Sequence, residues 1–185
     1  MTFVAAVCTG NVCRSPAVEL LLRARLGYAG VTVRSSGTRA LVGSPVDPPM
    51  AGLLRSSGLD PEPFRARALQ RDELRDADLV IALAREHRAA IAAVAPAAVR
   101  KTFLLGELAV LAPAVASAGW PEHLPPVEPA ARLAALPVLV AAHRSQVRLA
   151  DLDVADPFGR SPRSYAAALH HISTAVDAVV VALEG

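Results

Sequence analysis

The sequence predicts an α/β protein, a three-layer sandwich with a four-stranded parallel sheet and a phosphate-binding loop after the first strand. Short apolar runs alternate along the chain with longer segments that have helical spacing. This alternation is typical of parallel strands joined by right-handed crossovers, with helices on both faces. The chain has 185 residues, of which 53% are apolar, and this is enough for one buried core. We therefore expect residues 1–185 to form a single domain.

Each expected element follows from its own pattern. Phe3 to Val7 is a short apolar run that predicts a buried strand. Pro16 stands where proline is favoured in the first turn of a helix, and apolar residues continue at helical spacing to Leu26. The further elements are expected to be strands at 31–34, 79–83 and 102–105, a helix from Asp47 to about Ser57, and helices at 70–76, 86–94, 129–148 and 164–183.

Residues 106–150 are expected to form an extended, mostly helical segment within the domain. Its first half, from Gly106 to Val127, has mixed patterns, and four prolines are expected to interrupt any long element there. The helix expected at 129–148 begins with Pro129 and contains Pro137, at which it is expected to kink. We expect the segment to add a helix that covers one sheet edge, and a contact with a partner protein is the alternative.

Composition excludes several classes of protein. The formal charge of +2 is too small to predict nucleic-acid binding. Two cysteines, Cys8 and Cys13, are too few for a disulfide scaffold or a four-ligand zinc site. The longest uncharged apolar runs, 108–120 and 133–142, fall short of the roughly 18 residues that a membrane span requires. We expect a cytoplasmic protein without a membrane segment, metal or cofactor, present as a monomer or weak homodimer.

The segment from Cys8 to Pro16 joins the first strand to the first helix. A loop in this position turns successive backbone N–H groups inward, with the positive end of a helix dipole behind them. Gly10 allows the backbone angles of such an anion-binding loop, and the planar guanidinium of Arg14 can hold two phosphate oxygens. A Walker A loop is excluded because it ends in Gly-Lys-Ser/Thr, and the dinucleotide fingerprint because it needs three glycines.

Cys8 is expected at the bottom of this loop. The inward N–H groups and the charge of Arg14 favour a thiolate, which is a nucleophile toward a bound phosphate. Ser15 can donate a hydrogen bond to the sulfur when it becomes a leaving group. The alternative for an isolated cysteine is a small packed hydrophobe, but the arginine six positions later and the strand-to-helix setting favour the nucleophile.

The run CTGNVCRSP resembles the signature loop of the low-molecular-weight protein tyrosine phosphatases, and in particular their bacterial branch. The resemblance continues through residues 35–38, 66–67, 79–83 and 156–158 and into the last helix. It implies hydrolysis of phosphotyrosine through a cysteinyl-phosphate intermediate, with Cys8 as nucleophile and Arg14 as phosphate clamp. The implied phosphate-binding residues are Thr9, Gly10, Asn11, Val12, Cys13, Arg14 and Ser15.

The resemblance also implies a general acid, because an aryloxide leaves poorly without a proton. The family has this acid in a late Asp-Pro-aromatic loop, which Asp156-Pro157-Phe158 matches. Spacing alone does not separate Asp156 from Asp151 and Asp153, and an Asp-Pro pair is most often a turn. The resemblance assigns the role to Asp156, which then also activates the hydrolytic water.

Several residues are implied in supporting roles. Asn11 and Ser35 match positions that hold the loop in shape. Cys13 either forms a protective disulfide with Cys8 on oxidation or is a packed helix-start residue, and the two interpretations are left open. Leu41 and Phe158 are expected to line the substrate pocket, with Phe158 as its aromatic wall. Arg39 is expected to contact acidic or phosphorylated tails of the substrate.

Two positions depart from the family pattern. Many relatives carry a His where this chain has Phe64, and others carry an acidic or hydroxyl residue where it has Ala84. The hydrogen bonds that support the loop are therefore expected to differ. His87, His170 and His171 are expected to be surface or helix-packing residues.

The same fold and loop are compatible with three further functions. Arsenate reductase relays a disulfide through further cysteines, and this chain has none beyond Cys13, so an external thiol would have to replace them. The second is a protein-arginine phosphatase, and the third is a non-catalytic phosphate-binding module. The substrate that the resemblance implies is a phosphotyrosine protein, with a bacterial tyrosine kinase of polysaccharide export as the candidate.

Overall fold

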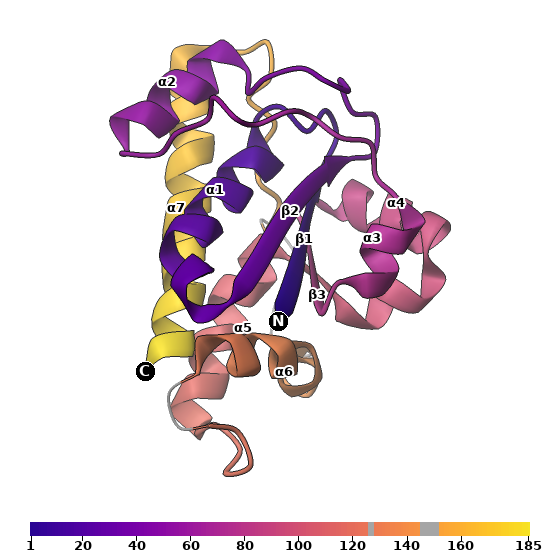
Figure 1. The fold of residues 1–185 in the computed structure, drawn as a ribbon, viewed down its shortest axis with the longest axis vertical. Coiled ribbons are helices and arrows are strands. Elements are labelled where there is room, and N and C mark those ends of the chain that lie inside the picture. The colour runs from indigo at the N-terminus through magenta and orange to yellow at the C-terminus, as the bar shows by residue number, and fades with distance from the viewer. Residues whose placement is uncertain (126–127, 145–151) are drawn as a thin grey trace.

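Four parallel strands form one sheet in the order β2-β1-β3-β4 in the computed structural model (Figure 1). The structure describes residues 1–125, 128–144 and 152–185. The strands are β1 (Thr2–Cys8), β2 (Val31–Gly37), β3 (Leu79–Ala82) and β4 (Thr102–Leu104). The central position of β1 brings its carboxyl end, where Cys8 lies, between the ends of β2 and β3. The predicted fold class is confirmed.

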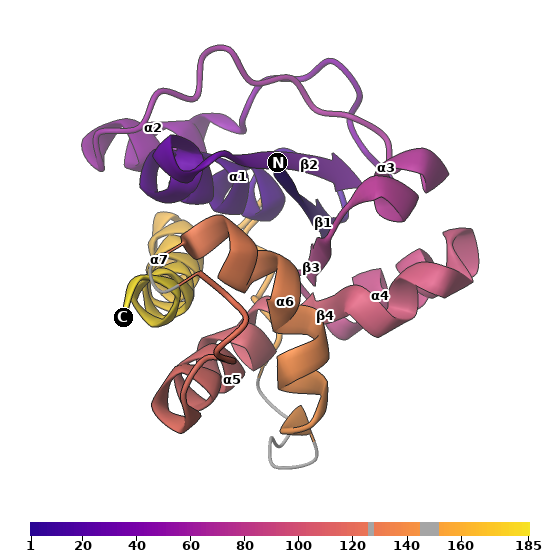
Figure 2. The ribbon, with the colours of Figure 1, turned by 60° about the horizontal axis from the view of Figure 1, so that its bottom comes forward.

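Helices cover both faces of the sheet (Figure 2). One face carries α1 (Arg14–Leu26), α5 (Leu105–Ala118) and α7 (Pro162–Glu184). The other carries α3 (Arg71–Asp76) and α4 (Arg85–Val94). The remaining elements are α2 (Pro48–Ser56), α6 (Pro129–Ala141) and the short 3-10 helices η1 (Gly27–Ala29) and η2 (Pro96–Lys101).

The alternation of side chains along β1 divides the core between the two faces. Val4, Ala6 and Cys8 belong to the cluster that includes α1 and α7, whereas Ala5 and Val7 belong to the cluster of α3 and α4. All five side chains are buried, as expected for a strand that is covered on both faces. The period of two therefore directs Cys8 toward the side of the sheet on which α1 begins.

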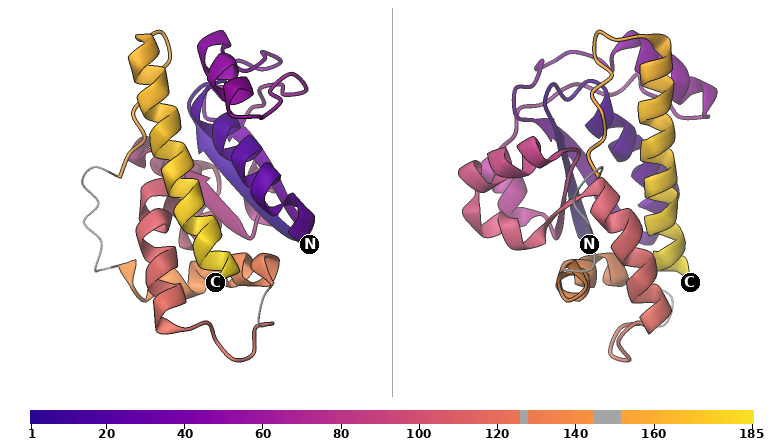
Figure 3. Two further views of the ribbon diagram at one scale, coloured as in Figure 1. Left: turned by 90° about the vertical axis from the view of Figure 1, so that its left-hand side faces the viewer. Right: turned by 180° about the vertical axis from the view of Figure 1, so that it is seen from behind.

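Helix α7 is the one described helix that is long and apolar enough to cross a membrane, by length and composition only. This helix was not selected among the long uncharged apolar runs in the sequence, because it contains the charged residues Arg163 and Asp177. Half of its most apolar window is buried inside the protein. The helix packs against α1, α2, α5 and α6 (Figure 3), so its apolar face is accounted for by the core.

The expectation that prolines interrupt any long element between residues 106 and 127 is wrong. Helix α5 has 14 residues and contains Pro113. Two features compensate for the hydrogen bond that proline removes. Glu107 in the first turn accepts a hydrogen bond from the Leu104 amide at 2.8 Å, and Leu108, Leu111 and Val115 are buried in the core that α5 shares with α7. Tertiary burial thus outweighs the local preference.

Other boundaries differ by a few residues. Strand β2 runs to Gly37 and not to residue 34, because residues 35–37 pair with residues 6–8 of β1. Helix α7 begins at Pro162, where the Ser161 hydroxyl accepts from the Ser164 amide. Helix α6 ends at Ala141, and residues 145–148 of the predicted helix lie outside the described residues.

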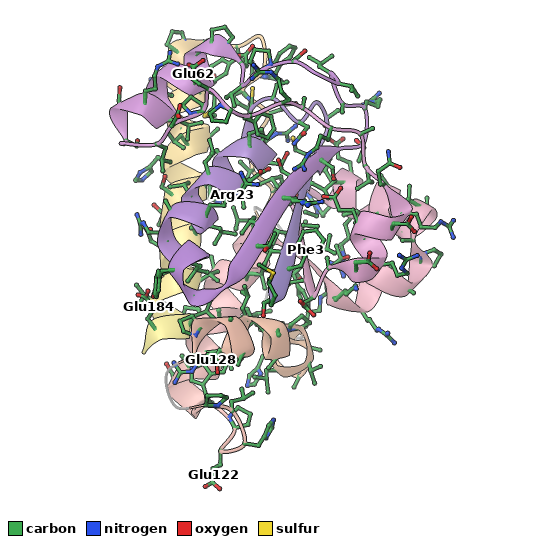
Figure 4. All side chains as sticks on the ribbon, viewed as in Figure 1. Phe3, Arg23, Glu62, Glu122, Glu128 and Glu184 are labelled. Carbon is green, nitrogen blue, oxygen red and sulfur yellow. The ribbon has the colours of Figure 1, made fainter. Side chains whose placement is uncertain are left out.

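Helix α6 falls within the extended segment 106–150, and α5 begins one residue before it, at Leu105. Helix α6 and the loop before it, which carries Glu122, lie at the end of the molecule opposite to the carboxyl ends of the strands (Figures 1 and 4). The Thr2 hydroxyl donates to the Ala130 carbonyl at 2.9 Å, which ties α6 to the start of β1. The described part of α6 is therefore remote from Cys8.

We predict that Gly37→Ala destabilises the protein and Gly52→Ala does not. A Cβ atom at Gly37 would lie 2.6 Å from the Thr9 carbonyl oxygen and 3.0 Å from Ala40 Cα, so the backbone must shift. We expect a loss of about 1–3 kcal/mol in the free energy of unfolding. Gly52 lies in α2, where a Cβ atom would meet nothing within 4 Å, and alanine there is expected to add about 0.5–1 kcal/mol. Denaturant unfolding of both variants tests this, and equal midpoints would contradict it.

Candidate active site

The loop that follows β1, here called the cysteine loop (residues 8–15), is held from outside by the segment 38–47. The carbonyl oxygens of Cys8, Thr9, Gly10 and Val12 accept from the amides of Thr38, Arg39, Leu41 and Asp47 at 2.9–3.0 Å. With the carbonyls turned outward, the amides face inward. The N–H groups of residues 9–15 donate to no group in the part of the chain that the structure describes. They form a concave set of donors at the start of α1, which suits an anion.

Asn11 is the strained residue of the cysteine loop, since it is the one described non-glycine residue with positive φ, at 55°. Its side chain is fully buried and satisfied. The amide nitrogen Nδ2 donates to Ser15 Oγ at 2.9 Å and to Ser35 Oγ at 2.8 Å, while Oδ1 accepts from the Arg67 amide at 2.7 Å. These three bonds offset the cost of the left-handed conformation and connect the loop to β2.

The hydrogen bonds continue from Ser35 to a buried carboxylate that the sequence pattern did not indicate. The Ser35 hydroxyl donates to Glu19 Oε2 at 2.6 Å. Glu19 is only 2% exposed, and its charge is paired with Arg23 Nη2 at 2.7 Å and Arg67 Nη2 at 3.4 Å. Figure 4 labels Arg23 on α1, beside β2, where its Nε also donates to the Val33 carbonyl at 3.0 Å. Paired in this way, a buried carboxylate is a stable acceptor for the network.

The other end of the network is the proposed nucleophile. Cys8 is 2% exposed, and its Sγ lies 3.0 Å from Ser15 Oγ. Because the Ser15 oxygen already accepts from Asn11, its hydroxyl hydrogen is left to donate, either to the sulfur or to the Ser36 carbonyl at 3.5 Å, and the sulfur is the nearer of the two. One chain of side-chain contacts therefore runs from Glu19 through Ser35, Asn11 and Ser15 to Cys8.

Arg14 and Asp156 meet at the wall of the site. Arg14 Nη2 contacts Asp156 Oδ2 at 2.7 Å, and Nη1 donates to the Val154 carbonyl at 3.2 Å. The Arg14 side chain is 3% exposed, whereas that of Asp156 is 45% exposed. Arg14 Nε has no partner among the described residues, so the guanidinium keeps a donor for a ligand. Asp156 lies far along the chain from Cys8, and only the fold brings it here.

These groups surround a cavity of about 170 Å³. Most of the residues predicted from the sequence line it, and Asn11, Ser15 and Ser35 are buried outside the lining, where they support the loop. Leu41 and Phe158, both about half exposed, are also lining residues, and their role in a substrate pocket stays a prediction. The full lining is Cys8, Thr9, Gly10, Val12, Cys13, Arg14, Arg39, Leu41, Asp156 and Phe158.

Of the three acidic candidates, the structure brings Asp156 to the cavity. Asp153 instead accepts from the Arg85 amide at 3.0 Å and pairs with Arg85 Nε at 3.2 Å, at the start of α4. Asp151 lies outside the described residues. The described residues also hold no group of three or more His, Cys, Asp or Glu side chains arranged to bind a metal ion.

Cys13 lines the cavity, and both cysteines are free thiols. Burial raises the pKa of Cys13 well above that of an ordinary thiol, and the negative charge of Asp47 adds to the shift. Cys13 is therefore held in its neutral form. The two interpretations of Cys13, redox partner or packed residue, both remain predictions.

His87 was expected on the surface or packed within a helix, but it is buried against the cysteine loop. It is 1% exposed, and its Nε2 lies 2.9 Å from Thr9 Oγ1. Burial and then the positive charge of Arg14 lower the pKa of His87 to about 4. His170 is exposed and His171 partly exposed on α7, as expected. The position of His87 in the chain could have predicted this contact, because residues that follow β3 lie beside the end of β1 in the sheet.

At the two departures from the family pattern, Phe64 and Ala84 are both buried. Phe64 makes no hydrogen bond to Glu19. Instead, Arg67 contacts that carboxylate and also donates to the Ser35 carbonyl at 2.9 Å. In this chain the contacts to Glu19 and to the Ser35 carbonyl therefore include those of Arg67, from the same segment as Phe64.

We predict that His87 makes the protein less stable as the pH falls from 6.5 toward 4. In this range the unfolded chain binds a proton at this residue and the folded chain does not, because the folded pKa is the lower one. The stability is present above pH 6.5 and is lost as the pH falls, by at most about 3 kcal/mol. The groups that act on this pKa are Arg14, which lowers it, and Glu86, Asp156 and Asp153, which raise it.

Denaturant unfolding between pH 7 and 4 measures this loss. His87→Gln is expected to flatten the pH dependence, whereas the exposed His170→Gln is expected to retain it. Identical slopes for the wild type and His87→Gln would contradict the prediction.

Comparison with known proteins relates the chain to a family of phosphatases. The family model described as low molecular weight phosphotyrosine protein phosphatase matches residues 3–112. The protein-tyrosine-phosphatase Etp of Escherichia coli K12 is 43% identical over 101 residues, which is 55% of this chain and 67% of that protein. The probable phosphatase EpsP of Ralstonia solanacearum is 37% identical over 102 residues, covering 55% and 69% of the two chains.

Solved structures share the fold over nearly the whole chain. The Erwinia amylovora tyrosine phosphatase AmsI superposes with a TM-score of 0.72 at 22% identity, covering 98% of this chain and 93% of the other. The arginine phosphatase YwlE from Geobacillus stearothermophilus gives a TM-score of 0.71 at 25% identity, covering 98% and 92%. With its model matched over more than half of the residues, the chain belongs to the low molecular weight phosphotyrosine protein phosphatase family.

Proposed function

We propose that this protein is a protein tyrosine phosphatase that hydrolyses phosphotyrosine through a cysteinyl-phosphate intermediate. The observation that carries the proposal is the placement of Cys8 beneath a ring of inward-facing amides, with Arg14 and Asp156 on the same cavity. A phosphate-binding module needs the amides and the arginine only. The carboxylate at the cavity supports an enzyme, since binding a phosphate dianion gains nothing from a negative charge.

Phosphate binding uses groups that are already in place. The amides of the cysteine loop and the α1 dipole receive the equatorial oxygens, and Arg14 supplies charge-assisted hydrogen bonds. The dianion also competes with Asp156 for the Arg14 donors, which lie 2.7 Å from that carboxylate. A general acid acts in its protonated form, and the Asp156 carboxyl lies on the cavity where it can pass that proton to the leaving oxygen.

In the first chemical step, the Cys8 thiolate attacks phosphorus. The S–P bond forms as the bond from phosphorus to the tyrosine oxygen breaks, and the Asp156 proton goes to that oxygen. In the second step, water attacks phosphorus and gives its proton to Asp156. The S–P bond breaks, and inorganic phosphate and the Cys8 thiolate are released. Ser15, 3.0 Å from the sulfur, stabilises the thiolate as it leaves.

The lining of the cavity favours an aryl phosphate. Val12, Leu41 and Phe158 are apolar and line its wall and mouth, where they contact the ring of phosphotyrosine. A phosphoguanidinium group has several N–H donors, for which these three side chains offer no acceptor, and Asp156 is the carboxylate on the lining that could accept from them. The fold itself does not decide between them, because it is shared with both tyrosine and arginine phosphatases. An arsenate reductase would need an external thiol, since the chain has no third cysteine.

We propose a cytoplasmic location, because a reactive thiolate needs a reducing compartment. The substrate that fits the bacterial branch of the family is a phosphotyrosine protein, such as a tyrosine kinase of polysaccharide export. This assignment rests on the family resemblance and is a proposal about the partner only.

We predict that Cys8→Ser abolishes hydrolysis of 4-nitrophenyl phosphate and of phosphotyrosine peptides. The loss is expected whether or not a chelator removes metal ions from the assay. Asp156→Asn is expected to lower kcat by about 10²–10⁴-fold, because it removes the general acid. The matched control is Asp153→Asn, which changes a nearby carboxylate that pairs with Arg85 outside the cavity. Activity in Cys8→Ser, or equal losses in the two aspartate variants, would overturn the proposal.

We further predict that Arg39 selects acidic residues beside the phosphotyrosine. Its side chain is exposed and lines the cavity, with no side-chain partner in the described part of the chain. Arg39→Gln is expected to lower kcat/KM about 3- to 10-fold for peptides with acidic flanks, and much less for neutral ones. Arg100→Gln, an exposed arginine of η2, is the control. Equal losses for both peptides would refute the role.

A further inference from the structure

Three side chains meet behind Arg14. His87 is the third residue of α4, and its Nε2 lies 2.9 Å from Thr9 Oγ1 and 3.3 Å from Glu86 Oε1. Thr9 Oγ1 is 3.4 Å from the same Glu86 oxygen. The Thr9 hydroxyl also accepts from Arg14 Nη2 at 3.3 Å. The residue after the nucleophile thus joins α4 to the phosphate clamp.

Counting donors and acceptors assigns the protons in this group. If the Thr9 hydroxyl donated to His87, the imidazole hydrogen would lie on Nδ1, which is buried and has no partner among the described residues. A buried N–H without an acceptor is rare in proteins. If His87 carries its hydrogen on Nε2, it donates to Thr9, and the Thr9 hydroxyl donates to Glu86 while accepting from Arg14. Every N–H and O–H in the group then has an acceptor.

The imidazole stays neutral in this arrangement. Burial and the charge of Arg14 hold the pKa of His87 at about 4, so it carries one ring hydrogen at neutral pH. A neutral donor orients the Thr9 hydroxyl without adding a positive charge that would repel Arg14.

We propose that His87 is a positioning residue of the reaction, which acts through the Thr9 hydroxyl to orient the Arg14 guanidinium toward phosphate. The inference rests on the proposed function. Because the Thr9 hydrogen is directed to Glu86, an oxygen lone pair of Thr9 faces Arg14 Nη2. Together with Asp156 at the same nitrogen and the Val154 carbonyl at Nη1, this contact fixes the plane of the guanidinium.

The contact with Thr9 differs from that with Asp156 in one respect that matters for catalysis. Asp156 must leave Arg14 in order to protonate the leaving group, so its hold on the guanidinium is lost during the reaction. Thr9 and His87 transfer no proton to the leaving group. They keep the guanidinium of Arg14 aligned while phosphate replaces the Asp156 carboxylate. A clamp that is aligned in advance loses less conformational freedom on binding, which favours both phosphate affinity and turnover.

The experiment measures two quantities, the affinity for inorganic phosphate by calorimetry and the steady-state constants for 4-nitrophenyl phosphate. The disruptive variants are His87→Leu, Thr9→Val and the double variant. The conservative variants are His87→Gln, whose amide N–H lies near the position of Nε2, and Thr9→Ser, which keeps the hydroxyl. His170→Leu, the same change at an exposed site on α7, is the control for loss of a histidine.

We expect His87→Leu and Thr9→Val each to weaken phosphate binding and lower kcat/KM by about 3- to 10-fold, as for one lost hydrogen bond. The double variant is expected to lose no more than either single variant, because both break one connection. His87→Gln and Thr9→Ser are expected to recover most of the loss. Losses that multiply in the double variant, unchanged phosphate affinity, or a His87→Gln as impaired as His87→Leu would overturn the inference.

The outcomes separate this inference from the proposed function. A wild type that binds phosphate but hydrolyses no aryl phosphate contradicts the function, and the calorimetry still tests the positioning of Arg14. An active wild type with additive losses contradicts the positioning alone. If His87→Leu does not fold, the comparison of Thr9→Val with Thr9→Ser decides, since both retain His87 and differ at the hydroxyl.

Discussion

Four backbone hydrogen bonds between the segment 38–47 and the cysteine loop are the constraint on which the site depends. They take up the carbonyl oxygens of Cys8, Thr9, Gly10 and Val12 and leave the amides directed inward. The same contact explains Gly37, where any side chain would press on the Thr9 carbonyl. An anion site made of backbone donors has no charge of its own to bury when empty, so it is compatible with the packed sheet around it.

Side chains then fix the backbone arrangement from within. Asn11 adopts a left-handed conformation that costs about a kcal/mol or more, and its three hydrogen bonds offset that cost. Glu19 anchors the network as a buried carboxylate between two arginines. Arg14 is held in turn by Asp156, Val154 and Thr9. The groups to which we assign the reaction are therefore held in place by the protein itself, which is the arrangement that electrostatic catalysis requires.

The sequence predicted those features that depend on residues close together in the chain. The strand periodicity of residues 3–7, the spacing of Cys8 and Arg14, and Pro16 in the first turn predicted the loop and its place at the end of β1. Asp156 needed the family resemblance, because spacing alone left three acidic candidates. Glu19 and His87 were missed, since their roles arise from contacts with Ser35 and Thr9 that only the folded chain creates. The prediction that Pro113 would interrupt a helix was wrong for the same reason. Burial of α5 against α7 outweighs the cost of the hydrogen bond that this proline removes.

In the proposed mechanism, Cys8 carries the phosphoryl group during the reaction. Mixing the Asp156→Ala variant with an aryl phosphate, quenching rapidly into denaturant and mapping the peptides by mass spectrometry tests it directly. We expect one phosphoryl group on the peptide that contains Cys8, attached at the Cys8 sulfur and absent when Cys8 is replaced by serine in the same background. Turnover with no adduct, or an adduct on Cys13 or any other residue, would contradict it.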